Sequence, residues 1–328
     1  MNGFLISLLG AMLATNQVTQ VSNVVARTTG LALPVVDPTD PAERALRAAM
    51  EQDDAAIADA ERWITEDQKQ MAAGAPASAT LDLRMQERFE GVIKAYDEFL
   101  VRHPKHVRGR LAYGSFLNEL GRTDEARAQW EKASELDPQN PAAWNNLASL
   151  YVHRPPVTNI FVYLGKAADL NPREPVYLRN LADAISLYRK DAREFYGLPD
   201  DTAVVRRSME LYRKALELDP TNLFLATDLA QTYYYFLLKP TATLPVDPKL
   251  VDEALEAWRA AERIARDEVQ RQGLYLHMAR VCGTQGRFSE ARRHLAQVDK
   301  PEFEESKKRL ARSVDQREAG TSDAFTEE

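Results

Sequence analysis

The sequence has 328 residues, of which 45% are apolar and 28% are charged, and 42 basic against 49 acidic side chains give a formal net charge of −7. This composition supports a large folded core, while the negative charge gives no general attraction to nucleic acid or anionic lipid, so we expect no nucleic-acid partner. The single cysteine, Cys282, excludes an intramolecular disulfide and a multi-cysteine metal site.

The chain begins with an apolar segment. No charged side chain precedes Arg27, and residues 4–14 form an apolar run about as long as the core of a signal peptide but too short to span a bilayer. Because the start lacks lysine and arginine, both an export signal and a surface-lying or buried amphipathic helix stay open. We assign residues 1–36 to this segment and its linker, and restrict any membrane association to residues 4–25. Localisation stays open between the cytoplasm and the envelope.

Two long helices are expected next. The prolines of residues 31–41 disfavour helix and separate the apolar start from the rest. Residues 37–80 form a helical extension, in which apolar residues recur at helical spacing over 42–71. A second helix is expected over 81–102, before Pro104.

Two abutting segments of 34 residues, 107–140 and 141–174, then repeat one pattern. The first places Tyr113, Gly114, Leu117, Gly121, Ala126, Trp130, Ala133 and Pro138 at positions 7, 8, 11, 15, 20, 24, 27 and 32. The second places Trp144, Leu147, Ala148, Tyr151, Ala167 and Pro172 at positions 4, 7, 8, 11, 27 and 32. This pattern resembles the signature of the tetratricopeptide repeat (TPR) family. The resemblance implies an all-α solenoid, a right-handed superhelix of helix-turn-helix units.

The repeats extend in both directions from this pair. Each hairpin leaves an apolar face that only a stacked neighbour can cover, so the array must continue. Val92 and Ser208 replace the usual alanine at position 20. Insertions around 191–203 and 239–248 are expected in turns at one edge. The predicted solenoid spans 81–315, with a half-repeat 89–106, repeats 107–140, 141–174, 175–222, 223–268 and 272–299, a capping helix 300–315 and a flexible tail 316–328.

Partners are expected in the groove. In this family the concave channel binds proteins or extended peptides, and positions 2, 5, 6, 9 and 13 of each first helix point into it. Asparagine, serine and glutamine can pair with a peptide backbone, and arginine can clamp a carboxylate. The alternative is that these side chains form solvated helix faces. The predicted groove residues are Arg108, Ser115, Asn145, Asn146, Ser149, Arg179, Asn180, Asp183, Thr227, Asp228, Gln231, His277 and Arg280.

One known type of groove is disfavoured. The chaperone-binding subgroup of the family would require a lysine, asparagine and arginine set across three repeats. The corresponding positions carry Leu111, Ser115, Asn146, Val176 and Asn180, so two of its positive charges are missing.

An aromatic patch at the edge of the stack is a second candidate surface. It consists of Phe195, Tyr196, Tyr234, Tyr235 and Phe236 beside the two insertions. The alternative, which we favour, is that these rings cover one another in a local minicore, since aromatic residues at helical spacing are more often buried.

The sequence contains no pattern that indicates catalysis or a bound cofactor. His103 and His106 flank Pro104 without two further ligands nearby, so zinc binding is disfavoured, and Cys282 occupies a core position. We expect no enzyme activity, no cofactor and no metal. The predicted function is a non-enzymatic scaffold or adaptor for a protein or peptide. The alternative is a structural component of a bacterial-type envelope or secretion assembly, located by its apolar N-terminus.

Overall fold

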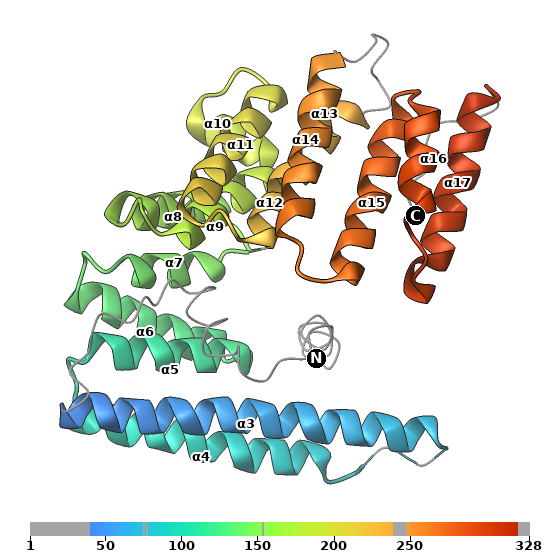
Figure 1. Cartoon of the computed structure of the whole chain (residues 1–328). Helices are drawn as coiled ribbons and strands as arrows, with labels where there is room; N and C mark the ends of the chain where they lie inside the picture. The colour runs from blue at the N-terminus through green and yellow to red at the C-terminus, as the bar shows by residue number, and fades with distance from the viewer. Residues whose placement is uncertain (1–39, 75, 77, 153, 239–247, 321–328) are drawn as a thin grey trace. The chain divides into compact units, whose positions relative to one another are not determined.

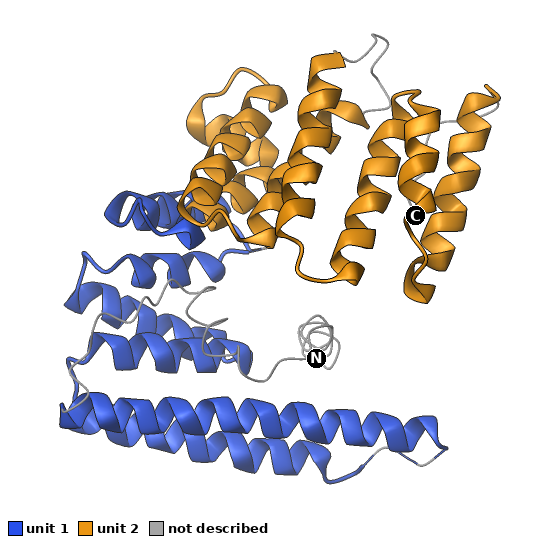
Figure 2. Cartoon of the chain, viewed as in Figure 1, with its two compact units in different colours: residues 1–177 blue, residues 178–328 orange. Residues whose placement is uncertain are grey.

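The computed structural model describes residues 40–74, 76, 78–152, 154–238 and 248–320, and these residues form helices joined by short turns, with no strand among them. The apolar segment 1–36, the tail residues 321–328 and the insertion 239–247 lie outside the described residues. No helix in the described ranges is long and apolar enough to cross a membrane. The chain divides into two compact units, residues 1–177 and 178–328 (Figure 2).

The first unit is a series of antiparallel helices, each packed on its neighbours in the chain (Figure 1). It contains α3 (Pro41–Ala72), α4 (Leu81–Arg102), α5 (Val107–Glu119), α6 (Thr123–Leu136), α7 (Pro141–Ser149) and α8 (Thr158–Leu170). The helix α9 (Pro175–Leu187) begins at the end of this unit and continues into the second.

The second unit continues the same arrangement of consecutive helices. It contains α10 (Arg189–Tyr196), α11 (Asp201–Leu218), α12 (Leu223–Thr232), α13 (Tyr234–Leu237), α14 (Pro248–Ile264), α15 (Glu268–Thr284), α16 (Phe288–Ala296), a 3₁₀ turn η2 (Pro301–Phe303) and α17 (Glu304–Glu318).

Side-chain caps set where many of the helices begin. Asp40, Asn140 and Asp267 each accept a hydrogen bond from a backbone N–H in the first turn of α3, α7 and α15. Such caps satisfy donors that a helix leaves unpaired. Between paired helices the chain turns at Gly121 and Gly286, whose φ angles of 74° and 75° lie in the left-handed region that favours glycine.

Small residues let the helices of a pair approach closely. A Cβ on Gly114 of α5 would lie 2.4 Å from Nε1 of Trp130 in α6, so only glycine fits at this position. The indole N–H of Trp130 donates to the carbonyl of Leu111 at 3.2 Å, which fixes the ring across the pair. Ala126 and Ala133 are fully buried beside it. The small and aromatic residues that recur at fixed positions of the repeat therefore lie in the contact between α5 and α6.

The helices α3 and α4 form a hairpin that is much longer than its neighbour α5. At about 1.5 Å per residue, the 32 residues of α3 span about 48 Å. Its buried residues end at Ala60, and those of α4 begin at Val92. The half-repeat expected at 89–106 thus has α3 as its first helix, and the end of the hairpin far from α5 contributes no buried residue.

The insertion predicted at 191–203 follows α9, and most of its residues are helical. Residues of this segment form most of α10, which ends at Gly197 with φ 63°. Asp200 then caps α11, which begins at Asp201. Short, strongly amphipathic segments with good caps form helices even where the repeat pattern is interrupted.

Candidate functional site

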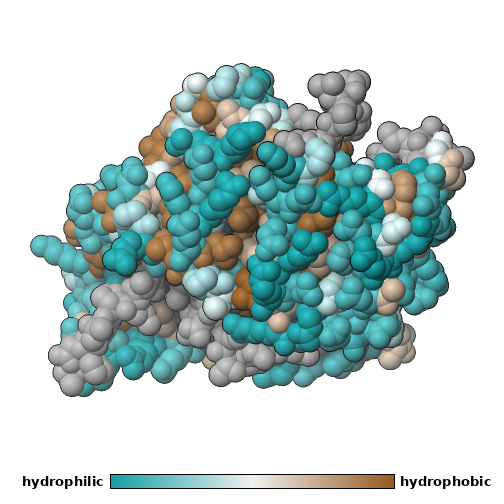
Figure 3. Space-filling model, turned by 45° about the horizontal axis from the view of Figure 1, so that its top comes forward, coloured by the Kyte–Doolittle hydropathy of each residue, from teal (hydrophilic) through white to brown (hydrophobic). Residues whose placement is uncertain are grey.

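The predicted groove residues come from the first helix of successive hairpins, so they lie on α5 and α7 in the first unit and on α9, α12 and α15 in the second. Hydrophilic residues cover most of the face shown in Figure 3, and hydrophobic residues gather in patches among them.

In the first unit, Arg108 is held by the preceding hairpin. Its guanidinium donates to the carboxylate of Glu43 on α3, and the two side chains are only 17% and 14% exposed. The same carboxylate lies 3.3 Å from Nε2 of His106. The other ring nitrogen of His106 accepts from the N–H of Gly109 and caps α5. Arg108 is therefore part of the contact between hairpins and offers little surface to a partner.

The asparagines of α7 are also internal. Asn145 and Asn146 are 6% and 4% exposed, and Nδ2 of Asn146 lies 3.5 Å from the hydroxyl of Ser115 on α5. Ser149 is exposed, and its hydroxyl donates to the carbonyl of Asn146. Burial of this kind is expected for amides that pair with one another. Because both side chains are buried, Asn145 and Asn146 do not line an exposed groove in this structure.

In the second unit, an ionic network joins α9, α11 and α12. Nε of Arg179 lies 2.8 Å from Asp228 and 3.8 Å from Asp183, and the hydroxyl of Tyr212 donates to Asp183. Burial raises the pKa of Asp183, while Tyr212 and Arg179 act in the opposite direction. The side chains of Arg179 and Asp183 stay 38% and 45% exposed, so the network both fixes the helices and faces solvent.

The other predicted residues of α9 and α12 vary in exposure. Asn180 and Thr227 are half-buried, and the hydroxyl of Thr227 donates to the carbonyl of Phe224. Gln231 is exposed. The second unit therefore presents ionic and amide groups together on the first helices of its hairpins.

His277 of α15 faces the interior on one side. Its ring lies parallel to that of Trp258, and its Nδ1 is 2.7 Å from the hydroxyl of Tyr234. Burial, and to a lesser extent the charge of Arg280, lowers the pKa of His277 to about 4. The imidazole is neutral at pH 7.

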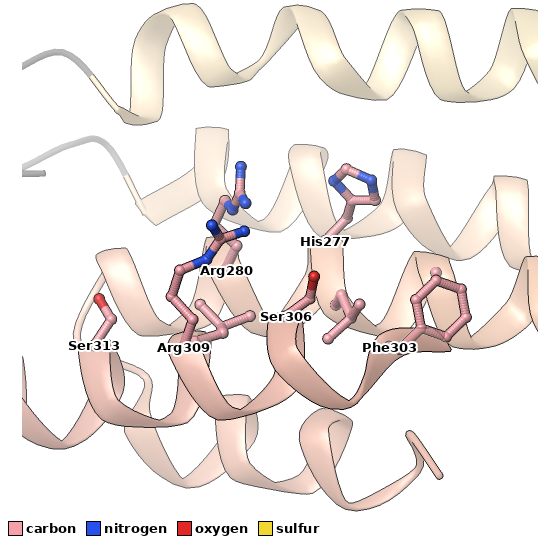
Figure 4. Close-up of a pocket in the computed structure, with 9 residues that line it drawn as sticks. His277, Arg280, Phe303, Ser306, Arg309 and Ser313 are labelled. Atoms are coloured by element: carbon pink, nitrogen blue, oxygen red, sulfur yellow. The ribbon is translucent and has the colours of Figure 1, made fainter. Parts of the chain in front are cut away.

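The other side of His277 lines a pocket of about 240 Å³ between α15 and α17 (Figure 4). Both Arg280 and Arg309 reach this pocket, and neither guanidinium makes a hydrogen bond or ion pair with any residue that the structure describes. The lining consists of Gly273, Leu276, His277, Arg280, Phe303, Ser306, Arg309, Leu310 and Ser313.

The predicted aromatic patch is partly covered by its own surroundings. Tyr234 packs into the core against Trp258, with ring centroids 5.8 Å apart. Tyr235 and Phe236 are half-buried and form an edge-to-face pair. Phe195, which is 41% exposed, forms a second edge-to-face pair with Tyr196, over which the guanidinium of Arg207 lies. Most of these rings contact one another or the core, as in a minicore.

The described part of the chain contains no candidate site for a metal ion or for a reactive thiol. No group of three or more histidine, cysteine, aspartate or glutamate side chains there could hold a metal ion. His103 and His106 pack around Phe99, with ring centroids 4.9 and 5.1 Å from its ring. Cys282 is fully buried, which raises the pKa of its thiol to about 11.

Comparison with known proteins identifies the repeat. Residues 114–153 match the family model described as TPR repeat. The solved structure of YrrB, a TPR protein described as having an unusual peptide-binding site, is 12% identical, covers 68% of this chain and 99% of its own, and superposes with a TM-score of 0.50. The chain therefore contains a tetratricopeptide repeat. Its fold is an all-α TPR solenoid, as the spacing predicted.

Two other solved structures are less similar in arrangement. TTC0263, a thermophilic TPR protein of Thermus thermophilus, is 19% identical and covers 64% of this chain and 99% of its own, with a TM-score of 0.41. The pilF protein of Pseudomonas aeruginosa is 15% identical and covers 83% and 99%, with a TM-score of 0.48. No curated protein matches the chain in sequence.

Several residues that shape the TPR inner faces were not predicted from the sequence. Glu43 holds Arg108 across 65 residues, Tyr212 holds Asp183 across 29, and Arg309 shares a pocket with Arg280. The helix of Arg309 was predicted only as a cap. Its arginine and serines at helical spacing, Ser306, Arg309 and Ser313, were the available signal.

Proposed function

We propose that this TPR protein is a non-enzymatic scaffold that binds a protein or an extended peptide along the first helices of its second unit. The observation that carries the proposal is the partly exposed network of Arg179, Asp183 and Asp228, with Gln231 displayed one turn further along α12. These groups offer both donors and acceptors to a peptide backbone.

The network also limits the cost of binding. Side chains that are already held by ion pairs lose less conformational freedom when a ligand arrives, so more of the interaction energy appears as affinity. The peptide-binding site of YrrB, a protein of similar fold, supports the same class of ligand. In the described residues, the buried histidine, thiol and carboxylates all contribute to packing, which supports a role without catalysis.

A peptide-display selection tests the proposal directly. Purified full-length protein is used to select binders from a random library of extended peptides, and the affinities of the selected peptides are measured by fluorescence polarisation. We expect Gln231→Ala to weaken binding by roughly fivefold, because a lost hydrogen bond to a peptide amide costs about 1 kcal/mol. Gln297→Ala, which removes an exposed glutamine from the end of α16, is the matched control.

Hydrogen exchange locates the bound peptide. We expect the peptide to slow amide exchange in α12 and α15, which are first helices, more than in α14 and α16, which are second helices. Failure to select any peptide, or protection confined to α14 and α16, would contradict the proposal.

A further inference from the structure

The pocket between α15 and α17 has the size of a single side chain. Its volume of about 240 Å³ is below the range of about 300–1,000 Å³ that is usual for sites of drug-sized ligands and cofactors. Its apolar wall comes from Leu276, Phe303 and Leu310, and its polar groups come from two arginines, two serines and His277. A short apolar stem that ends in a polar group fits this lining.

The charge of the pocket is uncompensated. Arg280 and Arg309 have no carboxylate among the lining residues and no ion pair with any residue in the described ranges. Other arginines of the same unit are paired: Arg292 contacts Asp315 and Glu318, and Arg287 lies 2.6 Å from Asp252. Two neighbouring guanidinium groups without a counter-charge favour an anionic ligand.

The two guanidinium groups lie so that one anion could bind between them. In Figure 4, Arg280 from α15 and Arg309 from α17 extend into the same part of the pocket, and the hydroxyl of Ser306 lies between Arg309 and His277. The imidazole of His277 adds no charge, because burial and Arg280 lower its pKa to about 4. The two arginines therefore supply the whole positive charge of the site.

We propose that Arg280 and Arg309 bind a carboxylate of an acidic peptide, from an aspartate or glutamate side chain or from the peptide's C-terminus. This inference rests on the proposed peptide-binding function and names the recognition element of the ligand. Planar guanidinium groups match a carboxylate through paired N–H···O bonds. The arginines come from the last hairpin and the helix after it, and they lie apart from the positions of the chaperone-type clamp.

Charge-matched variants and peptides test the assignment. The binders selected above are remeasured with each acidic side chain replaced by its amide, and with the C-terminal acid replaced by an amide. We expect one of these replacements to weaken binding by roughly tenfold or more, and Arg280→Gln and Arg309→Gln to do the same. Arg312→Gln removes the same charge from an exposed position of α17 outside the pocket and is the control.

The effects of the arginine substitutions and of the peptide changes on affinity should also be non-additive. Once the critical carboxylate is an amide, Arg309→Gln should have no further effect on affinity, because both changes remove one interaction. Additive losses would contradict the pairing. Selection of peptides whose binding is indifferent to all these changes would overturn this inference while leaving the proposed function intact.

A second measurement tests the carboxylate site even if the library selection yields no peptide. The side-chain Nε–H signals of Arg280 and Arg309 are followed by NMR in the full chain during titration with acetyl-glutamate amide, acetyl-glutamine amide and inorganic phosphate. Shifts of both signals with the glutamate compound alone support a carboxylate site independently of the scaffold role. Shifts with phosphate alone, or with none of the three, overturn the proposal.

Discussion

The indole ring of Trp258 lies parallel to the imidazole ring of His277, with ring centroids 4.3 Å apart and planes inclined by 7°. The pair joins α14 to α15 at the centre of the second unit, and Trp258 is fully buried. Because the other side of His277 lines the arginine pocket, the core contact and the candidate site share one side chain.

Replacing Trp258 should therefore unfold the second unit more readily. We expect Trp258→Ala to lower the free energy of unfolding by about 3–5 kcal/mol, because it leaves a large cavity. Urea denaturation followed by circular dichroism measures the change. Phe224→Ala, at a side chain that is 67% exposed, should stay within about 0.5 kcal/mol of the wild type. Equal effects of the two substitutions would contradict the central role of the stack.

The low pKa of His277 makes stability depend on pH. In the unfolded chain the imidazole titrates near 6.5, whereas in the folded protein its pKa is about 4. Between these values the unfolded state binds more protons, so the contribution is complete above pH 6.5 and is lost as the pH falls toward 4. We expect His277→Gln to show a smaller loss of stability between pH 7 and pH 5 than the wild type, by roughly 2 kcal/mol. A ring-nitrogen NMR titration that gives a pKa near 6.5 would contradict this expectation.

The contribution of Asp53 to stability depends on pH in the opposite direction. Burial, with the nearby charge of Glu119, raises the pKa of Asp53 to about 8, and the hydroxyl of Tyr96 donates to its carboxyl at 3.0 Å. The unfolded carboxyl ionises near pH 4, so the folded state loses relative stability as the pH rises from about 4 to 8. We expect Asp53→Asn to stabilise the first unit at pH 7 by roughly 1–3 kcal/mol and to have little effect at pH 4.

Asp59, on the same helix, provides the matched control. Its hydrogen bonds with Arg88 and Arg62 lower its pKa, so it favours the folded state at neutral pH. Asp59→Asn should destabilise the protein at pH 7, and denaturation midpoints at pH 4 and pH 7 distinguish the two variants. The same sign for both would refute the assignment of Asp53 as a protonated carboxyl.

Gly114 tests the close contact of α5 and α6. Gly114→Ala should destabilise the first unit by about 1–3 kcal/mol, since its methyl group would overlap the indole of Trp130. Gly91→Ala, in α4 with nothing within 4 Å of the added carbon, should stabilise by about 0.5–1 kcal/mol through helix propensity. Thermal melts of the two variants should therefore shift in opposite directions, and a shift in the same direction would contradict the steric argument.

Much of the fold could be predicted because the repeat ties residue type to position. Gly114, Ala126 and Trp130 marked a pair of helices in contact, and the TPR fold that they indicated is confirmed. The helix α10 was missed because the period says nothing about inserted residues. The first helix of the half-repeat, α3, was not recognised as such because its buried residues include Ala56 and Ala60, which are common in any helix.

The site was harder to predict, because position on a helix does not determine the partner of a side chain. Arg108 and Asn146 occupy groove positions, but Glu43 pairs with the first and packing buries the second. These contacts depend on how adjacent hairpins stack, which a single repeat does not encode. Arg280 was predicted as a groove residue, whereas its pocket also needs Arg309 from a helix beyond the last repeat.

The length of the α3–α4 hairpin has a dynamic consequence. Toward the tip the two helices contact each other through pairs such as Arg84 over the ring of Trp63 and Arg88 with Asp59. Contacts with the next hairpin begin at Phe89, whose ring lies 6.0 Å from that of Phe116 in α5. A two-helix segment without a third layer opens at far lower free energy than a packed core. Local fluctuations should therefore start at this tip and stop where α5 begins to cover the pair, so the hairpin contains a stable anchor and a loosely held arm.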